Sequence, residues 1–431
     1  MKTKIFKLAF IILIASFASC SETNDKITDQ KDYNIYLELE ENEALLIARG
    51  DHQFWEKKLE KNPDQFPYMM KLAASQSQLF NLTGNIEYLK DAETYLVQAN
   101  EITNNDNAGY LRSLARNYIS QHRFSEALEV LKKAEINGEK LRATQLMLFD
   151  TYLELGNIEK AKYYLNATEN YKEFDFLIRK SKWSDHHGEL NFAIDYLENA
   201  MAIAESSNNK QLLQWVYTNI ADYYGHDGQI KKSYEHYLKA LQLNPSNSYA
   251  KKGIAWIVYS YEKNPDEALR ILDSTTRRYE APDYYLLRAE IAEYSNDLKL
   301  KYENINQFLQ TIQNESYGVM YNAHLANLFA EEYQDYSKSL QLAQLEIDQR
   351  PTPLSYDLLA WTYFQKKEFK KALAVAEKHV LNKTFEPIAL YHIAEIYKAL
   401  GDQDNLKKLK PELVESGFEL GPLMAQKIQQ L

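Results

Sequence analysis

The histidines are the first residues whose chemistry could serve a function. Asp185, His186 and His187 stand side by side before a glycine, and His226 and His236 share a later segment. Neither group combines two ligands at i and i+4 with a third, which is the arrangement that zinc favours on helices. Ordinary surface histidines explain both groups, so we expect no metal ion.

No other pattern in the chain supports catalysis. The sequence has no glycine-rich phosphate loop, no serine nucleophile elbow and no cysteine set beside a catalytic base. Adjacent acids such as Glu331 and Glu332 point to different sides of a helix, so they are better explained as solvated charges than as an acid/base pair. We therefore expect no cofactor and no enzymatic activity.

The N-terminus has the composition of a secretory signal. Lys2, Lys4 and Lys7 precede the apolar run Leu8 to Ala15, and a polar stretch follows Cys20. The run is too short to cross a bilayer. We expect residues 1–19 to be a signal peptide that takes no part in the fold.

Cys20 is the one residue of this region with distinctive chemistry. It is the only cysteine of the 431 residues and directly follows Ala18 and Ser19, which resembles a bacterial lipoprotein processing site. The resemblance implies that Cys20 carries the lipid and anchors the chain in the cell envelope, the outer membrane being favoured over the inner. An ordinary cleavage after Ala18 or Ser19, which leaves Cys20 as a free thiol, stays open. A lone cysteine excludes an internal disulfide.

The segment Tyr217 to Pro245 has the pattern of two packed helices. Its apolar and small residues fall at i, i+3, i+4 and i+7 before Gly228 and at i, i+4, i+7 and i+8 after it, which makes one stripe per helix. The stripes consist of Tyr217, Ile220, Ala221 and Tyr224, and of Ser233, Tyr237, Ala240 and Leu241. The small residues predict a close approach of the two helices.

This unit recurs along the chain with a period of about 34 residues. Ala115 and Phe149 hold equivalent positions one period apart, as do Ala127 and Ala161. In a weaker copy, Lys301 stands where alanine is usual. The predicted hairpins start at Phe66, Ala108, Leu141, Phe174, Lys210, Asn247, Asp283, Tyr317, Leu354 and Pro387.

The order of small, aromatic and glycine residues resembles the tetratricopeptide repeat. The resemblance implies an all-α solenoid of tandem helical hairpins with a right-handed superhelix. We expect one elongated body rather than separate domains. The expected divisions are a signal peptide (1–19), a flexible tether (20–32), an N-terminal helical cap (33–65), the repeat solenoid (66–416) and a C-terminal capping helix (417–431).

The resemblance also implies a concave groove, lined by the first helix of each hairpin, that holds peptides or partner helices. Residues offset from the packing stripe of each first helix form i, i+4 pairs that would face this groove. They supply the candidate partner-binding residues, which are Arg112, Arg116, Asp150, Asp222, Trp361, Tyr391 and Glu395. Ordinary solvated helix positions would have the same spacing.

The net charge is -11 and becomes about -14 without the three signal lysines, which disfavours nucleic-acid binding. We expect a non-enzymatic, lipid-anchored scaffold that binds other envelope proteins or peptides. A nutrient- or glycan-capturing outer-membrane lipoprotein stays open as the alternative, although the chain lacks a long insert outside the repeats.

Overall fold

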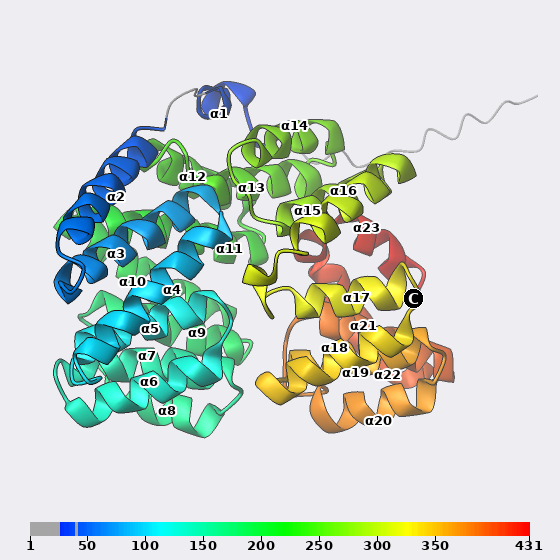
Figure 1. The fold of residues 1–431 in the computed structure, drawn as a ribbon. Coiled ribbons are helices and arrows are strands. Elements are labelled where there is room, and N and C mark those ends of the chain that lie inside the picture. The colour runs from blue at the N-terminus through cyan, green and yellow to red at the C-terminus, as the bar shows by residue number, and fades with distance from the viewer. Residues whose placement is uncertain (1–25, 39–41) are drawn as a thin grey trace, which may run out of the picture.

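The computed structural model describes residues 26–38 and 42–431, and the described chain is built from helices alone (Figure 1). It is an all-α protein of 23 helices packed as sequential hairpins, a solenoid of the tetratricopeptide type. The predicted fold class is thereby confirmed. Cys20 and the signal peptide lie outside the described residues.

Ten hairpins form the body, and each consists of a first and a second helix. The first helices are α3 (Phe66–Thr83), α5 (Ala108–Ser120), α7 (Leu141–Glu154), α9 (Phe174–His186), α11 (Lys210–His226), α13 (Ser248–Trp256), α15 (Asp283–Tyr294), α17 (Asn322–Glu331), α19 (Pro353–Gln365) and α21 (Pro387–Leu400). The second helices are α4 (Ile86–Ile102), α6 (Phe124–Asn137), α8 (Ile158–Ala167), α10 (Leu190–Ser207), α12 (Ile230–Leu243), α14 (Pro265–Thr276), α16 (Leu298–Thr311), α18 (Tyr336–Gln349), α20 (Phe369–His379) and α22 (Gln403–Glu415).

Three further helices flank the hairpins. α2 (Glu43–Lys61) packs on α3, whereas the short α1 (Gln30–Leu37) reaches across to contact α12 and α14. α23 (Gly417–Gln429) ends the chain. A π-helical turn, η1 (Ile257–Tyr261), extends α13, and a 3-10 turn, η2 (Glu315–Tyr317), precedes α17. Because of η2, the eighth hairpin begins at Asn322 rather than at Tyr317, while the other nine begin within one residue of the predicted start.

Asparagine and aspartate side chains fix many of the helix starts. Asn107 accepts a hydrogen bond from the backbone N–H of Tyr110 at 3.0 Å, and Asn247 accepts one from that of Ala250 at 2.8 Å. These bonds satisfy backbone donors that the first turn of a helix leaves unpaired. The same cap is present at Asn42, Asn85, Asn157, Asn209, Asn264, Asp297, Asp335 and Asp402.

Small residues let the helices of a hairpin approach closely. Ala115, Ala127, Ala221 and Ala240 are completely buried, and Ser233 is nearly so. Aromatic side chains then fill the space between hairpins, where their large area makes burial most favourable. The core therefore runs along the whole array instead of being concentrated at one point.

The array curves until hairpins six positions apart touch. The turn inside the first hairpin, α3–α4, meets the loop before the seventh, α15–α16, where the N–H of Glu280 donates a 2.7 Å hydrogen bond to the carbonyl oxygen of Thr83. A Cβ on Gly84 would lie 2.9 Å from the backbone nitrogen of Ala281. Glycine is required there for two reasons: a side chain would clash with the backbone of Ala281, and the φ of 72° lies in the left-handed region.

The same relation recurs in later hairpins. A Cβ on Gly188 would lie 2.7 Å from the ring of Phe385, and Arg350 is 3.6 Å from Glu154. We call this row of contacts the seam; it comprises Thr83–Glu280, Glu154–Arg350, Gly188–Phe385 and Gly225–Phe418. Because of the seam, the hairpins stack as successive turns of a superhelix, and the body is less extended than the repeat pattern alone predicts.

Candidate protein-binding face

The first helices of the hairpins face a common interior. Side chains of α3, α5 and α11 line one cavity of about 530 Å³, although these helices are far apart in the sequence. We call the surface that the odd-numbered helices α3 to α21 present to this interior the inner face. It corresponds to the groove that the sequence predicts.

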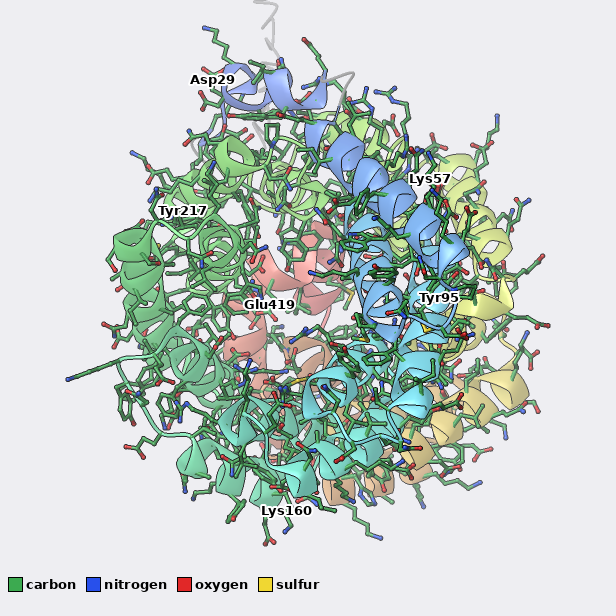
Figure 2. The ribbon with its side chains drawn as sticks, turned by 60° about the vertical axis from the view of Figure 1, so that its left-hand side comes forward. Asp29, Lys57, Tyr95, Lys160, Tyr217 and Glu419 are labelled. Atoms are coloured by element: carbon green, nitrogen blue, oxygen red, sulfur yellow. The ribbon has the colours of Figure 1, made fainter. Side chains whose placement is uncertain are left out.

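The last helix of the chain covers part of the inner face. α23 contacts α11, α15, α21 and the η1 turn. The carbonyl oxygen of Phe418 accepts hydrogen bonds from Trp256 Nε1 at 3.1 Å and from Ser260 Oγ at 2.6 Å. Figure 2 shows Glu419, at the start of α23, in the middle of the ring of helices. The inner face thus already holds one helix.

Gly421 allows the close approach of α23. Its φ is 81°, and a Cβ there would lie 2.9 Å from the Trp256 ring and 3.0 Å from Glu290 Oε1. Burial raises the pKa of Glu290 to about 7, although its oxygen accepts a 3.2 Å hydrogen bond from the Tyr259 hydroxyl. Protonated Glu290 therefore suits this tight contact better than the carboxylate does.

A second group of acids lies at the start of α23. Burial raises the pKa of Asp185, Glu386 and Glu419, and these carboxyl groups repel one another. His226 lies 3.8 Å from Glu419 and opposes the increase. The seat of α23 is consequently rich in acids that bind protons more tightly than usual.

The cavity between α3 and α5 is an open part of the inner face. Its wall is formed by small and polar side chains such as Ala74, Ser77 and Gln78, together with Arg116. Arg116 is exposed, and its side chain forms no ion pair with any residue in 26–38 or 42–431. Of the predicted groove residues, it has the most freedom to contact a partner.

Arg112, one turn earlier on α5, is held by the next hairpin. Its Nη1 donates to the carbonyl oxygen of Glu139 at 2.8 Å and to Thr144 Oγ1 at 3.1 Å. Burial lowers its pKa. The two arginines predicted as a pair therefore differ, since Arg112 joins two hairpins and Arg116 faces the cavity.

Asp150 and Asp222 also bond within the array. Asp150 accepts from Arg179 Nε at 3.0 Å and Nη2 at 2.7 Å, which links α7 to α9. Asp222 accepts from the Tyr249 hydroxyl at 2.7 Å and from the Tyr237 hydroxyl. Burial raises the pKa of Asp222.

Trp361, Tyr391 and Glu395 come together between α19 and α21. Trp361 and Tyr391 are each 5% exposed, and their ring centroids are 6.2 Å apart. Trp361 Nε1 donates to Glu331 at 2.6 Å, and the Tyr391 hydroxyl donates to Glu395 at 3.0 Å. The indole ring also stacks on His392 at 3.8 Å. In this conformation the two aromatic side chains connect neighbouring first helices and are covered from solvent.

Two further properties of the described residues are metal binding and the length and apolarity of their helices. Within the described ranges, no group of three or more His, Cys, Asp or Glu side chains could hold a metal ion. Nor is any described helix both long and apolar enough to cross a membrane.

Sequence reasoning did not identify the residues that seat α23. Phe418, Gly421 and Trp256 carry this contact, and Glu290 lies beside it. The one signal in the sequence is the cluster of Gly417, Gly421 and Pro422, which marks the end of the last repeat without indicating what α23 packs against.

Comparison with known proteins identifies the repeat. Residues 216–247, which span most of the α11–α12 hairpin, match the family model described as tetratricopeptide repeat. The chain therefore contains a tetratricopeptide repeat, as its sequence pattern predicts. No curated protein matches it.

Several solved structures resemble parts of the chain. A tetratricopeptide repeat protein from Parabacteroides merdae is 16% identical over 60% of this chain and 97% of its own, with a TM-score of 0.35. Yeast Tom70 is 13% identical over 94% of this chain and 100% of its own, with a TM-score of 0.36. A Rap protein complexed with competence and sporulation factor is 14% identical over 76% of this chain and 99% of its own, with a TM-score of 0.44. All three TM-scores lie below 0.5, so these likenesses carry no functional weight.

Proposed function

We propose that this protein is a non-enzymatic scaffold that binds a peptide or a helix of another envelope protein on its inner face. The seat of α23 is the observation that carries the proposal, because it is an intramolecular case of a helix held by α11, α15 and α21. The open cavity between α3 and α5, with Arg116 in its wall, offers further surface of the same kind. Lipid attachment at Cys20 would hold the scaffold at the envelope, in the outer membrane by preference.

Affinity purification from detergent-solubilised cells tests this function with two charge reversals. Arg116→Glu should weaken partner capture by at least about 1 kcal/mol, because arginine is among the side chains that most often carry interface energy. Lys133→Glu is the matched control, since Lys133 is exposed on the second helix α6, away from that cavity. Equal recovery of the same partners by both variants would contradict binding at this cavity.

The alternative, a glycan-capturing lipoprotein, predicts a different result from the same samples. Calorimetry would then detect direct binding of a glycan to the purified protein, while no protein partner is recovered. That combination of outcomes would reject the scaffold.

A further inference from the structure

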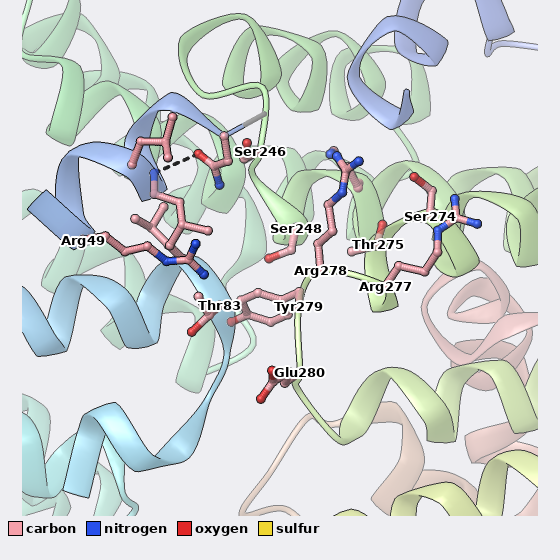
Figure 3. Close-up of a pocket in the computed structure, with 15 residues that line it drawn as sticks. Arg49, Thr83, Ser246, Ser248, Ser274, Thr275, Arg277, Arg278, Tyr279 and Glu280 are labelled. Atoms are coloured by element: carbon pink, nitrogen blue, oxygen red, sulfur yellow. Dashed lines mark hydrogen bonds between the residues drawn. The ribbon is translucent and has the colours of Figure 1, made fainter. Parts of the chain in front are cut away.

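A cavity of about 440 Å³ lies between α2 and the end of α14, next to the first contact of the seam. Figure 3 shows Arg49 on one side and Arg277 and Arg278 on the other, with Tyr279 and Glu280 between them. Lys251 of α13 also lines the cavity. Four cations around one lining acid are notable in a chain whose net charge is -11.

These cationic side chains lack counterions in the part of the chain that the structure describes. No hydrogen bond or ion pair joins the side chain of Arg49, Lys251, Arg277 or Arg278 to a residue in 26–38 or 42–431. Arginines at a surface tolerate this because water solvates them. Lys251 is different, since it is only 8% exposed.

A buried ammonium group without a carboxylate partner destabilises the folded state. Burial, assisted by the positive charge of Arg278, lowers the pKa of Lys251 to about 8. Methionine has a similar shape and would fill this position without a buried charge. A bound anion would reduce the free-energy cost of burying the charged Lys251 side chain.

The other lining groups favour an anion with several oxygens. The hydroxyls of Thr83, Ser274 and Thr275 already donate to backbone carbonyl oxygens, so they can only accept. Donors that remain for a ligand include the four cations and the hydroxyl of Ser246 beside them. α13 also begins at Ser248 and directs the positive end of its dipole to this region.

We propose that this cavity binds the phosphate group of a phosphorylated ligand. Guanidinium groups pair with phosphate oxygens in a forked geometry, and a lysine adds a compact charge. The volume lies within the range of small-molecule sites, so the ligand extends beyond the phosphate. A soluble phosphate ester and the headgroup of an anionic lipid share this chemistry. The site is separate from the inner-face cavity of the proposed function.

Thermal unfolding in phosphate or in chloride at equal ionic strength tests the proposal. Saturating inorganic phosphate should raise the Tm of the wild type by about 2 °C or more, because a ligand that binds only the folded state stabilises it. Lys251→Met should have a higher Tm than the wild type in chloride and should bind phosphate at least about tenfold more weakly. The exposed control, Lys133→Met, should behave as the wild type. Equal Tm values in phosphate and chloride, or phosphate binding unaffected by Lys251→Met, would overturn the proposal.

Two further arms complete the design. Glucose 6-phosphate and vesicles of phosphatidylcholine and phosphatidic acid separate a soluble ester from a lipid, and failure of both to compete with inorganic phosphate would also overturn the proposal. The variant E40Q/E41Q removes the two acids that precede Asn42 in the sequence. If phosphate stabilises only that variant, these acids are the counterions of the four cationic side chains in the native chain, and the proposal is wrong.

Discussion

The N–H of Glu280 donates a 2.7 Å hydrogen bond to the carbonyl oxygen of Thr83, across almost half of the chain. This bond joins the first hairpin to the loop before the seventh. In an open solenoid, each repeat contacts only its neighbours, and stability is close to a sum of local terms. The seam adds a second set of contacts, so the first and second superhelical turns should unfold together.

Gly84 tests the contribution of the seam to stability. Gly84→Ala introduces a Cβ 2.9 Å from the backbone of Ala281, and the backbone there cannot move aside as a flexible side chain could. Gly138→Ala is the matched control, because Gly138 has a similar φ of 79° and open space around it. Both changes should cost about 1 kcal/mol for the left-handed φ, and Gly84→Ala should cost at least about 1 kcal/mol more. Denaturant unfolding that gives equal losses would show that the seam contributes little.

Lys301 should be essential to its hairpin although it occupies a place where alanine is usual. Its Nζ lies 2.6 Å from Glu332 and 2.9 Å from Glu293, and its side chain is 8% exposed. Lys301→Met should destabilise the protein by about 2 to 4 kcal/mol, because two acids lose their counterion. The triple variant K301M/E293Q/E332Q removes those charges and should recover part of the loss. A triple variant no more stable than the single one would show that packing of the lysine stem dominates.

The seat of α23 should weaken as the pH rises. Glu290 binds a proton more tightly in the folded state than its ordinary pKa of 4.5 allows in the unfolded chain, so its contribution is fully present below about pH 4.5. That contribution is lost as the pH rises through about 7, and its size is about 3 kcal/mol. Hydrogen exchange of α23, corrected for intrinsic rates, should be faster at high than at low pH.

Glu290→Gln separates this effect from the general response of the protein to pH. The variant should flatten the pH dependence of exchange in α23, although only in part, since Asp185, Glu386 and Glu419 act in the same direction. Exposed Glu129 on α6 gives the control Glu129→Gln, which should leave the profile unchanged. A profile that is identical in wild type and Glu290→Gln would rule out this carboxyl group as the cause.

Cys20 remains a prediction from the sequence. If it carries lipid, the wild type should enter the detergent phase in phase partitioning, because two or more acyl chains give stable membrane attachment. Cys20→Ser should stay in the aqueous phase and keep the same helical content. The prediction of lipid attachment at Cys20 is wrong if both forms stay in the aqueous phase.

The hairpins could be predicted because their determinants are local. Small residues such as Ala115 and Ala127 recur at fixed spacing, and asparagine caps such as Asn107 mark the helix starts. Both act over a few residues or between adjacent helices, where periodicity in the sequence is informative. The starts of nine hairpins followed to within one residue from the repeat pattern of small and aromatic residues, and the caps are a finding of the structure.

The seam and the seat of α23 could not be predicted in the same way. Gly188 and Phe385 touch although no periodic pattern relates them. The spacing of Trp361 and Tyr391 correctly placed them on first helices, but spacing does not tell whether a large side chain faces solvent or the next helix. Both are buried, so Trp361→Ala should cost about 3 to 5 kcal/mol of stability, and weaker partner capture by that variant would not by itself prove contact.

The seam also limits how this array can change in length. Insertion or deletion of a whole hairpin is harmless in a repeat array whose members interact only with the next one along. Here, loss of the fifth or the sixth hairpin would bring Gly84 opposite the wrong loop and displace Gly188 from Phe385 at the same time. Homologues of this protein should therefore conserve the number of hairpins between paired turns and loops, and vary in length beyond the paired region.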